Sequence, residues 1–440
     1  MIFRSRIQEY DLIAPTPENR LRLFAAGFHL EVLFRYKTQK IGLTGYKNIK
    51  IHAKINKIEM FVRRCLMADR GVWAEIDLSA LRHNISVIKN HIAKGARFCA
   101  VVKADAYGHG AIAVAREAVA MGADYLAVAV LSEAEKLRRA GFTTPILVLG
   151  ATQIEEADAV VDFGVTQAVF SRDVAAAISA AAQRRRRRAK VHLAVDTGMG
   201  RIGVRPENAG EMAAFIAGLP NIELEGMFSH FALADAADKT VANEQFARFK
   251  LAMEGVKAKG IEIPICHIAN SAAILEMPET HLDMARAGII LYGLAPSDEV
   301  GQDAGLQPVM SVKARLTHVK TLHEGETVSY GCTFRAPKDI LVGTLPLGYE
   351  DGYTRLYAGK AKVDLRGHLL PVIGRICMDQ CMVELTGVNN VAVGDTVTIM
   401  GGDALSADAL AGWIGTINYE VVCMFSPRIP RVYVESGQTI

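Results

Sequence analysis

A lysine interrupts an apolar stretch near residue 100 of this 440-residue chain. The segment "FCAVVKADAYGHG", residues 98–110, begins like a buried strand and places Lys103 where another valine would pack well. A lysine at a strand end usually extends its amine to water along an apolar stem. An amine held in a partly desolvated pocket can instead form a Schiff base with a carbonyl compound. The other polar residues of the chain decide between these two interpretations.

Further polar residues follow apolar segments in the same way. They are His230 at the end of "LEGMFSH", Asn270 and Ser271 at the end of "ICHIANS", Arg286 within "MARAGIILYG", and Arg201 on the glycine-rich "DTGMGRIG" after "VHLAVDT". Taken singly, each has a structural explanation, such as a satisfied strand-end histidine. In a barrel of parallel strands, reactive groups sit at the C-terminal strand ends. We therefore expect these residues and Lys103 to form one site.

The residue types in this set indicate which chemistry the site supports. The set holds no clustered carboxylates and no histidine pair at metal-ligand spacing, which disfavours metal-dependent hydrolysis. Ser271 and the backbone of Gly288 and Ile289 follow the last two strands, where barrels commonly bind phosphate. A lysine opposite a phosphate cradle is the arrangement that pyridoxal 5'-phosphate (PLP) requires. The residues therefore predict a PLP site without a metal ion.

The positioning elements follow from the hydrophobic pattern. Eight apolar runs alternate with helical segments between residues 98 and 293. Such runs are typical of parallel strands that are buried on both faces. An open, doubly wound sheet has the same alternation, so the count of eight strands decides in favour of a closed (β/α)8 barrel. A strand at 72–78 and a helix capped by Ser79 precede it, with Leu81, Ile85 and Ile88 on the buried helix face.

The helices end after about Pro296, and strand-length segments such as "ETVSYGCTF" alternate with Gly, Asp and Asn turns from there on. We therefore predict an α/β chain with a PLP-binding (β/α)8 barrel at residues 69–303 and a C-terminal mainly-β domain at residues 304–440. Residues 1–68 are lysine-rich and fit neither pattern. We interpret them as a dispensable extension or as the product of a start codon assigned too far upstream, because Met67 directly precedes the patterned segment.

Composition limits the partners and the compartment. A formal net charge of +3 is too small to favour nucleic acid as the main partner, and the run "RRRRR" at 184–188 suits the solvated C-terminal end of a helix. Seven scattered cysteines without a CxxC pair indicate neither a disulfide framework nor a structural zinc site, which predicts a reducing, cytoplasmic compartment. No apolar run approaches the ~20 residues of a membrane span, and the charged first residues do not resemble a signal peptide.

Several motifs carry a resemblance to a known family. They are "AVVKADAYGHG", "VDTGMGRIGVR", "FSHFALAD", "ANSAA", "MARAGIILYG", "VSYGCTF", "PLGYEDGY" and "GRICMDQCMV". These motifs, spread over residues 71–434, resemble those of bacterial alanine racemase, a PLP-dependent isomerase family (EC 5.1.1.1) with a barrel and a β-domain. The resemblance implies interconversion of L- and D-alanine, which supplies D-alanine for the peptidoglycan of the cell wall.

The resemblance also implies roles for individual residues. Racemisation by two bases on opposite faces of the substrate makes Lys103 one base and Tyr330 the other. A phenol with its ordinary pKa of ~10 is a poor base, and His230 is the family's candidate to hydrogen-bond this hydroxyl. Arg286 is implied to face the pyridine nitrogen. Because arginine does not readily give up its proton, that nitrogen would stay unprotonated, which weakens the electron sink and discourages side reactions.

The remaining site residues follow from the same motifs. The implied cofactor-binding residues are Lys103, Tyr107, His230, Asn270, Ser271, Arg286, Gly288 and Ile289. The implied substrate-binding residues are Arg201, Met378, Asp379 and Tyr349. By the same resemblance, Tyr330 and the segment 377–379 come from a second subunit. We therefore expect a homodimer with shared active sites.

Two positions depart from the family pattern. Ala194 stands where many members carry a carbamylated lysine that braces the arginine, here Arg201. Pro427 is expected to replace a tyrosine that reaches the PLP phosphate, which predicts a weaker phosphate anchor and a roomier pocket. A broad-specificity amino-acid racemase (serine- or lysine-type) therefore stays open as an alternative. So do a PLP-dependent decarboxylase, a catalytically decayed member and a non-enzymatic PLP-binding carrier protein.

Overall fold

A computed structural model of the protein describes residues 20–25, 28–33, 70–435 and 438–439. The chain divides after Val72 into two compact units. In the first unit, the described residues form an antiparallel pair of strands, β1 (Arg20–Ala25) and β2 (Phe28–Leu33). The rest of the segment 1–68 that we expected to be an extension lies outside the described residues.

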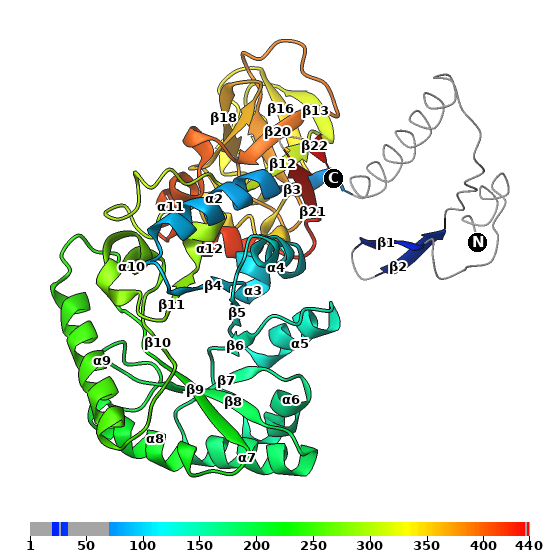
Figure 1. The fold of residues 1–440 in the computed structure, drawn as a ribbon. Helices are drawn as coiled ribbons and strands as arrows, with labels where there is room; N and C mark the ends of the chain where they lie inside the picture. Colours follow the sequence, from blue (N-terminus) through cyan, green and yellow to red (C-terminus); the bar gives the residue numbers. More distant parts are fainter. Residues whose placement is uncertain (1–19, 26–27, 34–69, 436–437, 440) are drawn as a thin grey trace, which may run out of the picture. The chain divides into compact units, whose positions relative to one another are not determined.

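Eight parallel strands form the barrel in the second unit (Figure 1). They are β4 (Arg97–Val101), β5 (Tyr125–Val128), β6 (Ile146–Val148), β7 (Thr166–Val169), β8 (Ala189–Ala194), β9 (Ile222–Phe228), β10 (Ile265–His267) and β11 (Met284–Ala287). Each strand pairs with the next along the chain as far as β10, and β11 pairs with β4. Between β10 and β11, the N–H groups of Asp283 and Arg286 donate to the carbonyls of Cys266 and Ala269, each at 3.1 Å. The predicted barrel is therefore confirmed in a nearly closed form.

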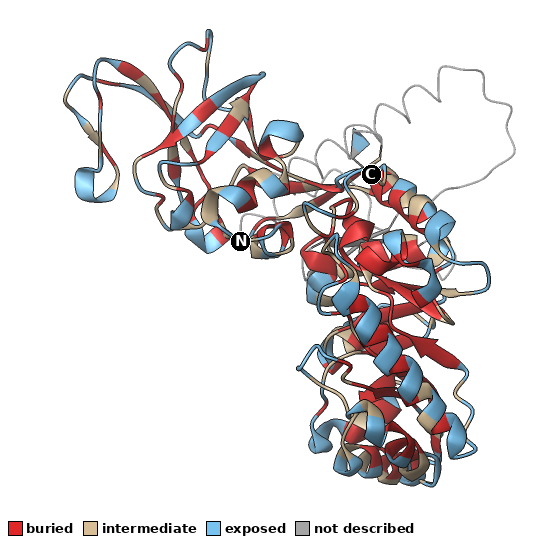
Figure 2. Ribbon diagram, turned by 90° about the vertical axis from the view of Figure 1, so that its left-hand side faces the viewer, coloured by how far each residue is buried: buried red, intermediate tan, exposed pale blue. Residues whose placement is uncertain are grey.

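Helices follow the strands along the chain. They are α2 (Leu78–His91), α4 (Ala111–Ala120), α5 (Leu131–Arg139), α6 (Ala157–Asp162), α7 (Arg172–Arg185), α8 (Ala209–Ala217), α9 (Thr240–Ala258) and α10 (Ser271–Glu276). Figure 2 shows the barrel strands as buried, whereas the helices alternate between buried and exposed faces. This is the arrangement that near-continuous apolar strands and amphipathic helices encode.

Helix α2 shows how the sequence sets a helix boundary and its buried face. Leu81, Ile85 and Ile88 are fully buried, as their spacing predicts. The cap is Asp77 and not the expected Ser79, because the carboxylate of Asp77 accepts hydrogen bonds from the N–H groups of Ser79 and Ala80.

The arginine run at 184–188 lies at the C-terminal end of α7, as predicted. Arg184 pairs with Asp158 and Arg185 pairs with Asp162, each at 2.8 Å on the exposed surface. Positive side chains in the last turn also suit the negative end of the helix dipole. The run is thus a charge-paired helix end.

A ten-stranded sheet forms the second half of this unit. Its strands, in spatial order, are β13 (His318–Leu322), β16 (Ile340–Leu345), β19 (Cys381–Glu384), β18 (His368–Ile373), β17 (Lys362–Leu365), β20 (Thr396–Met400), β12 (Met310–Arg315), β3 (Val72–Asp77), β21 (Arg431–Glu435) and β22 (Gln438–Thr439). Strand β3 runs parallel to β21, with Ala74 opposite Arg431. The opening strand, which the sequence boundaries group with the barrel, therefore pairs with C-terminal strands.

Two helices lie within the C-terminal part, α11 (Ala407–Ile414) and α12 (Asn418–Met424) (Figure 1). The expectation that helices end after about Pro296 is therefore wrong. The start signal of α11 is Ser406, whose side-chain oxygen accepts the N–H of Ala409 at 3.1 Å. The C-terminal domain is thus mainly β but also contains two helices.

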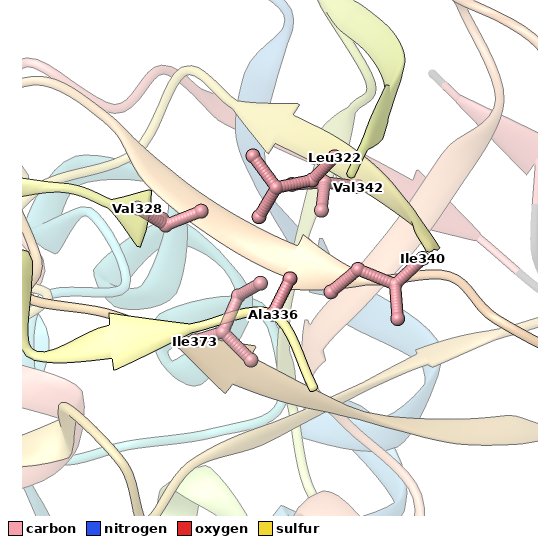
Figure 3. Close-up of a cluster of buried hydrophobic side chains, with 6 residues drawn as sticks. All are labelled: Leu322, Val328, Ala336, Ile340, Val342 and Ile373. Carbon is pink, nitrogen blue, oxygen red and sulfur yellow. The ribbon is translucent and has the colours of Figure 1, made fainter. Parts of the chain in front are cut away.

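Tyr330 lies in a 3₁₀ turn, Tyr330–Cys332, between the paired short strands β14 (Thr327–Val328) and β15 (Phe334–Arg335). The continuous strand expected through "ETVSYGCTF" is therefore interrupted at Tyr330. Val328 of this hairpin belongs to a cluster of buried side chains with Leu322, Ala336, Ile340, Val342 and Ile373 (Figure 3). Burying each aliphatic side chain of this size contributes roughly 1.5–3 kcal/mol. The hairpin is thus fixed on a packed base, while the Tyr330 side chain is 70% exposed.

Candidate active site

A cavity of about 980 Å³ opens at the C-terminal ends of the barrel strands. Of the candidate residues, it is lined by Lys103, Tyr107, Arg201, His230, Asn270, Ser271, Arg286, Gly288 and Ile289. Most of them lie at the end of a strand or within four residues after it, as the sequence pattern predicts for a barrel site. The fold thus brings together residues that are up to 186 positions apart, from Lys103 to Ile289.

Lys103 is half-buried in this cavity, just after β4. Its amine lies 5.9 Å from the ring centre of Tyr107. Burial lowers the pKa of the Lys103 amine, and the nearby charge of Arg201 lowers it further. Both effects favour the unprotonated amine, which is the nucleophilic form.

Arg286 lies at the floor of the cavity, and its side chain is almost fully buried. Its guanidinium donates to Nδ1 of His267 at 2.7 Å, to the carbonyl of Ser229 at 2.8 Å and to the carbonyl of Ile268 at 3.1 Å. Burial lowers its pKa to about 10, so the group stays charged at neutral pH. The cavity floor is therefore a fixed positive charge with a defined orientation.

The tautomer of His230 follows from Arg286. Nη2 of Arg286 lies 3.2 Å from Nδ1 of His230. A guanidinium can only donate, so a proton on Nδ1 would face the N–H groups of Nη2, and the ring therefore carries its proton on Nε2. Burial lowers the pKa of His230 to about 3, with a further contribution from the charge of Arg286. His230 is therefore a neutral hydrogen-bond donor at this site.

An oxygen-lined recess surrounds Gly288. The N–H of Gly288 donates to Oγ of Ser271 at 2.9 Å. A Cβ atom at Gly288 would lie 3.0 Å from the Tyr107 hydroxyl and 3.4 Å from Oγ of Ser271. A side chain at this position would therefore occupy the space between two hydroxyl groups that can donate to an anion. Asn270 acts beside this recess, where its Oδ1 accepts the N–H of Ala273 at 3.1 Å and caps α10.

Arg201 and Ala194 both line the cavity. Ala194 belongs to an apolar cluster with Ala168 and Phe228, so it offers Arg201 no polar partner. The Arg201 side chain is exposed, and no hydrogen bond or ion pair to it occurs among residues 70–435. The departure from the family pattern at Ala194 therefore leaves Arg201 available to an anionic ligand.

The other candidate residues, Tyr330, Tyr349, Met378 and Asp379, lie together elsewhere, outside the cavity lining. The N–H of Tyr349 donates to the carbonyl of Cys377 at 3.0 Å, and that of Glu350 donates to the carbonyl of Met378 at 3.1 Å. Oγ of Ser329, next to Tyr330, donates to the carbonyl of Arg375 at 2.5 Å.

All four side chains of this second group are exposed, including Met378 at 51% and Tyr349 at 39%. The predicted site residues therefore form two groups within one chain. One group surrounds Lys103 in the barrel cavity, and the other is presented on the surface of the β-rich part.

Tyr419 is a cavity residue that the sequence reasoning missed. It lies on α12 and lines the cavity, with its ring centre 6.3 Å from that of Tyr107. Pro427, in contrast, is exposed and does not line this cavity. Pro427 thus supplies no side chain to this cavity, to which Tyr419 contributes a tyrosine from α12, and the hypothesis of a roomier pocket stays a prediction. The helix-capping signal at Ser406 could have indicated that helices approach the site from this segment.

Comparison with known families decides the assignment. Residues 76–296 match the family model "Alanine racemase, N-terminal domain", and residues 309–433 match "Alanine racemase, C-terminal domain". The chain belongs to the alanine racemase family. Both matched segments begin after the N-terminal part at 1–68, so the family resemblance does not extend to it.

Alanine racemases from other organisms are similar over nearly their whole length. The alanine racemase of Desulfovibrio desulfuricans is 56% identical over 367 residues, which cover 83% of this chain and 99% of that protein. The alanine racemase of Desulforamulus reducens is 50% identical, with 82% of this chain and 99% of that protein covered.

Solved alanine racemase structures share the fold. The alanine racemase of Clostridium difficile 630 superimposes with a TM-score of 0.82 at 41% identity, covering 85% of this chain and 98% of that one. The alanine racemase of Bacillus anthracis with bound L-Ala-P gives a TM-score of 0.80 at 35% identity, covering 84% and 97%. The barrel with its mainly-β partner is thus the alanine racemase fold. Within the described residues, no helix has the length and apolar character to cross a membrane.

Proposed function

We propose that this protein is an alanine racemase that interconverts L- and D-alanine with PLP held at Lys103. The observation that carries this proposal is the arrangement of one cavity, in which the Lys103 amine and the hydroxyl-lined recess at Gly288 are both exposed to the same space. The barrel at residues 69–303 would hold the cofactor, and the mainly-β domain at residues 304–440 would supply the second base.

The residues of the cavity fit PLP. The recess formed by Tyr107, Ser271 and the backbone of Gly288 and Ile289 suits a phosphate group, and Tyr419 adds a further hydroxyl. The charged guanidinium of Arg286 suits the pyridine nitrogen as an acceptor. The lowered pKa of Lys103 leaves its amine free to hold the aldehyde carbon. Bound PLP supplies an electron sink that makes the Cα–H of an attached amino acid acidic.

Two bases on opposite faces would complete the reaction. Lys103 removes or returns a proton on one face, and Tyr330 of a second subunit does so on the other. Tyr330 of the same chain is exposed and lies outside the cavity, so a second copy is the source that a shared site requires. The Nε2–H of His230 would donate to the phenol oxygen and favour its ionised form. Asn270 would support the recess by capping α10.

The substrate carboxylate would be held at the edge of this site. Arg201 has no other anion to neutralise among the described residues, so its charge is available to orient a carboxylate. Met378 and Asp379 of the second subunit would border the substrate, with Tyr349 at the entrance. Orienting the carboxylate fixes the Cα–H bond between the two bases, which is the geometric requirement of the reaction.

Complementation between two inactive variants tests the shared site. Lys103→Ala and Tyr330→Phe would each lower racemisation at least about a hundredfold when purified alone. In mixed dimers, one of the two sites would combine an intact Lys103 with an intact Tyr330. A random mixture should therefore recover about a quarter of the wild-type rate, because about half of the dimers are mixed and each holds one intact site. No recovery after unfolding and refolding the two variants together would refute shared sites.

A simpler measurement tests the cofactor. The wild-type protein should develop a visible absorbance band with PLP, and Lys103→Ala should not. The comparison should be made on protein beginning at Met1 and on protein beginning at Met67, which tests whether the segment 1–68 is dispensable. Persistence of the band in Lys103→Ala would overturn the assignment of the reactive amine.

The product suggests where the enzyme acts. D-Alanine is a precursor of peptidoglycan, so we propose a biosynthetic role in the cytoplasm. The described cysteines are all unpaired, which suits a reducing compartment, and Cys65 lies outside the described residues. A serine- or lysine-type racemase, which Pro427 motivates, stays the alternative, and racemisation of Ala, Ser and Lys by wild type and Pro427→Tyr would distinguish the two.

A further inference from the structure

One turn of left-handed helix follows Lys103. The residues Ala104, Asp105, Ala106 and Tyr107 have φ between 51° and 56°. The ψ angles of the first three lie between 46° and 52°. These are the dihedrals of an ideal left-handed helix, which non-glycine residues adopt only at a steric cost. Several consecutive strained residues persist only where surrounding contacts hold them.

Glu133 supplies such contacts at the end of the turn that adjoins Lys103. Oε1 of Glu133 accepts the N–H of Ala104 at 2.6 Å. Oε2 accepts the N–H of Ala129 at 2.8 Å and that of Val130 at 3.4 Å. One carboxylate in the first turn of α5 therefore joins the residue after Lys103 to the end of the neighbouring strand β5.

Other groups hold the far end of the turn. Oδ1 of Asp105 accepts the N–H of Ala111 at 2.9 Å, and Nε of Arg431 donates to the carbonyl of Gly108 at 2.8 Å. The backbone closes the turn where the N–H of Gly108 donates to the carbonyl of Ala104 at 2.9 Å. Among the described residues, Glu133 is thus the side chain that binds the backbone N–H directly after Lys103. The other contacts hold the turn at positions further along the chain.

The charge of Glu133 also affects the pKa of the Lys103 amine. Burial and the charge of Arg201 lower the pKa of the Lys103 amine, whereas the charge of the Glu133 carboxylate opposes this effect. Arg286 adds a second positive charge on the side of the cavity floor. The carboxylate therefore sits close enough to Lys103 to influence it while its oxygens remain bound to backbone N–H groups.

We propose that Glu133 is a positioning residue for Lys103, whose carboxylate holds the left-handed turn and so fixes the direction of the reactive side chain. This inference rests on the proposed role of Lys103 as the amine that holds PLP. The hydrogen bonds of Glu133 are present in the chain without cofactor, so the turn can be tested separately from catalysis.

Hydrogen exchange of the full-length, cofactor-free protein is the first test. In Glu133→Gln, the amide –NH₂ replaces one acceptor oxygen, so either Ala104 or the pair Ala129 and Val130 loses its partner. Loss of a hydrogen bond to a charged group should speed exchange of the affected N–H groups about tenfold to a hundredfold. Glu135→Gln is the matched control, because Glu135 lies on the same helix in an exposed ion pair with Arg139. Unchanged exchange at Ala104, Ala129 and Val130 in Glu133→Gln would overturn the proposal.

A rescue experiment separates turn-holding from a general structural effect. Glycine adopts the left-handed conformation without the steric cost, and Ala104 is exposed, so Ala104→Gly removes strain and little packing. We expect Glu133→Gln to slow PLP capture and lower kcat about tenfold or more. The double variant Glu133→Gln/Ala104→Gly should regain most of both. If the double variant captures PLP as slowly as Glu133→Gln, Glu133 does not act through the turn.

A shorter acid separates charge from reach. Glu133→Asp keeps the negative charge but cannot span Ala104 and Ala129 together, so its exchange and PLP capture should resemble those of Glu133→Gln. Wild-type behaviour of Glu133→Asp would show that charge alone suffices and would refute the positioning role. If the wild-type protein failed to racemise alanine, the exchange results would still stand, so the two failures are distinguishable.

Discussion

Nη1 of Arg286 lies 2.7 Å from Nδ1 of His267, and this contact sets the direction of a buried hydrogen-bond chain. Because the guanidinium can only donate, Nδ1 of His267 accepts and Nε2–H points onward. His267 then donates to Nδ1 of His192 at 2.9 Å, and Nε2–H of His192 donates to Glu225 at 3.3 Å. The charge of Arg286 is thereby connected through two neutral rings to a carboxylate inside the barrel.

Buried neutral histidines should make the protein less stable in mild acid. Burial lowers the pKa of His230 to about 3, that of His109 to about 4, and that of His267 well below its ordinary value. In the unfolded chain these groups bind protons below pH ~6.5, whereas the folded chain does not. The free energy of unfolding should therefore fall as the pH drops from ~6.5 towards ~4, by at most about 1.4 kcal/mol per pH unit for each histidine.

Urea unfolding of the cofactor-free protein between pH 5 and pH 8 would measure this dependence. Burial raises the pKa of the Glu225 carboxyl, but hydrogen bonds from His192 and Lys190 outweigh that effect and hold this pKa at about 2. Protonation of Glu225 therefore lowers the free energy of unfolding only at a pH below the measured range. Above pH ~7 the histidines contribute no slope. A midpoint that stays constant from pH 5 to pH 7 would contradict burial of the histidines in neutral form.

Removing the phenol of Tyr330 should leave a one-sided enzyme. In Tyr330→Phe, Lys103 is the remaining base, so racemisation should fall by roughly 10²–10⁴-fold. One enantiomer of alanine should still exchange its Cα hydrogen with deuterium from D₂O, because Lys103 still acts on one face. Proton NMR of L- and D-alanine in separate reactions would measure this. Tyr353→Phe is the control, since it removes a buried hydroxyl that has no hydrogen-bond partner among the described residues. Equal exchange of both enantiomers in Tyr330→Phe would argue against the two-base assignment.

Arg201 should affect substrate binding more than cofactor binding. Arg201→Met removes the charge proposed to orient the carboxylate, so KM for alanine should rise roughly tenfold to a hundredfold, while the absorbance of bound PLP is retained. Arg205→Met is the control on the same segment, because Arg205 lies in an exposed ion pair with Glu207. Steady-state kinetics in both reaction directions would show the effect. An unchanged KM would mean that the carboxylate is bound elsewhere.

The barrel was predictable from the sequence because both faces of its strands are buried. Runs such as "FCAVV" and "ILV" have no polar position to satisfy, so the pattern alone locates them. Lys103, His230 and Arg286 were predictable because they are polar residues at or near the ends of such apolar runs. A polar side chain at the end of such a run is unusual, and the barrel topology gathers those ends on one face.

Other features follow from tertiary context that the sequence does not reveal. Ala104 and Ala106 have no preference for left-handed backbone, and the conformation depends on distant partners such as Glu133 and Arg431. Tyr419 was missed because its helix α12 is short, and a helix of a few residues leaves a weak periodic signal. Whether Tyr330 serves its own cavity or that of another copy depends on packing between chains, which a single chain's pattern does not encode.

The close approach of Gly110 to Tyr433 should make this glycine hard to replace. Gly110 and Gly95 both have φ of 95°, but a Cβ at Gly110 would lie 2.1 Å from the Tyr433 hydroxyl, whereas one at Gly95 meets no atom of the described residues within 4 Å. Gly95→Ala should therefore lower the free energy of unfolding by only about 1 kcal/mol, for its positive φ. Gly110→Ala should lower it by roughly 1–3 kcal/mol more, because Tyr433 must move.

A double variant isolates the steric part of this effect. Tyr433→Phe removes the oxygen that the new methyl group meets first, so Gly110→Ala/Tyr433→Phe should recover part of the stability lost in Gly110→Ala. Gly110 closes the segment that begins at Lys103, and its N–H donates to the carbonyl of Asp105 at 2.8 Å. A displaced Gly110 should therefore also weaken PLP binding, while Gly95→Ala should not. Denaturant unfolding and PLP titration of the four proteins would test this, and equal losses in Gly95→Ala and Gly110→Ala would show that contact with Tyr433 is not limiting.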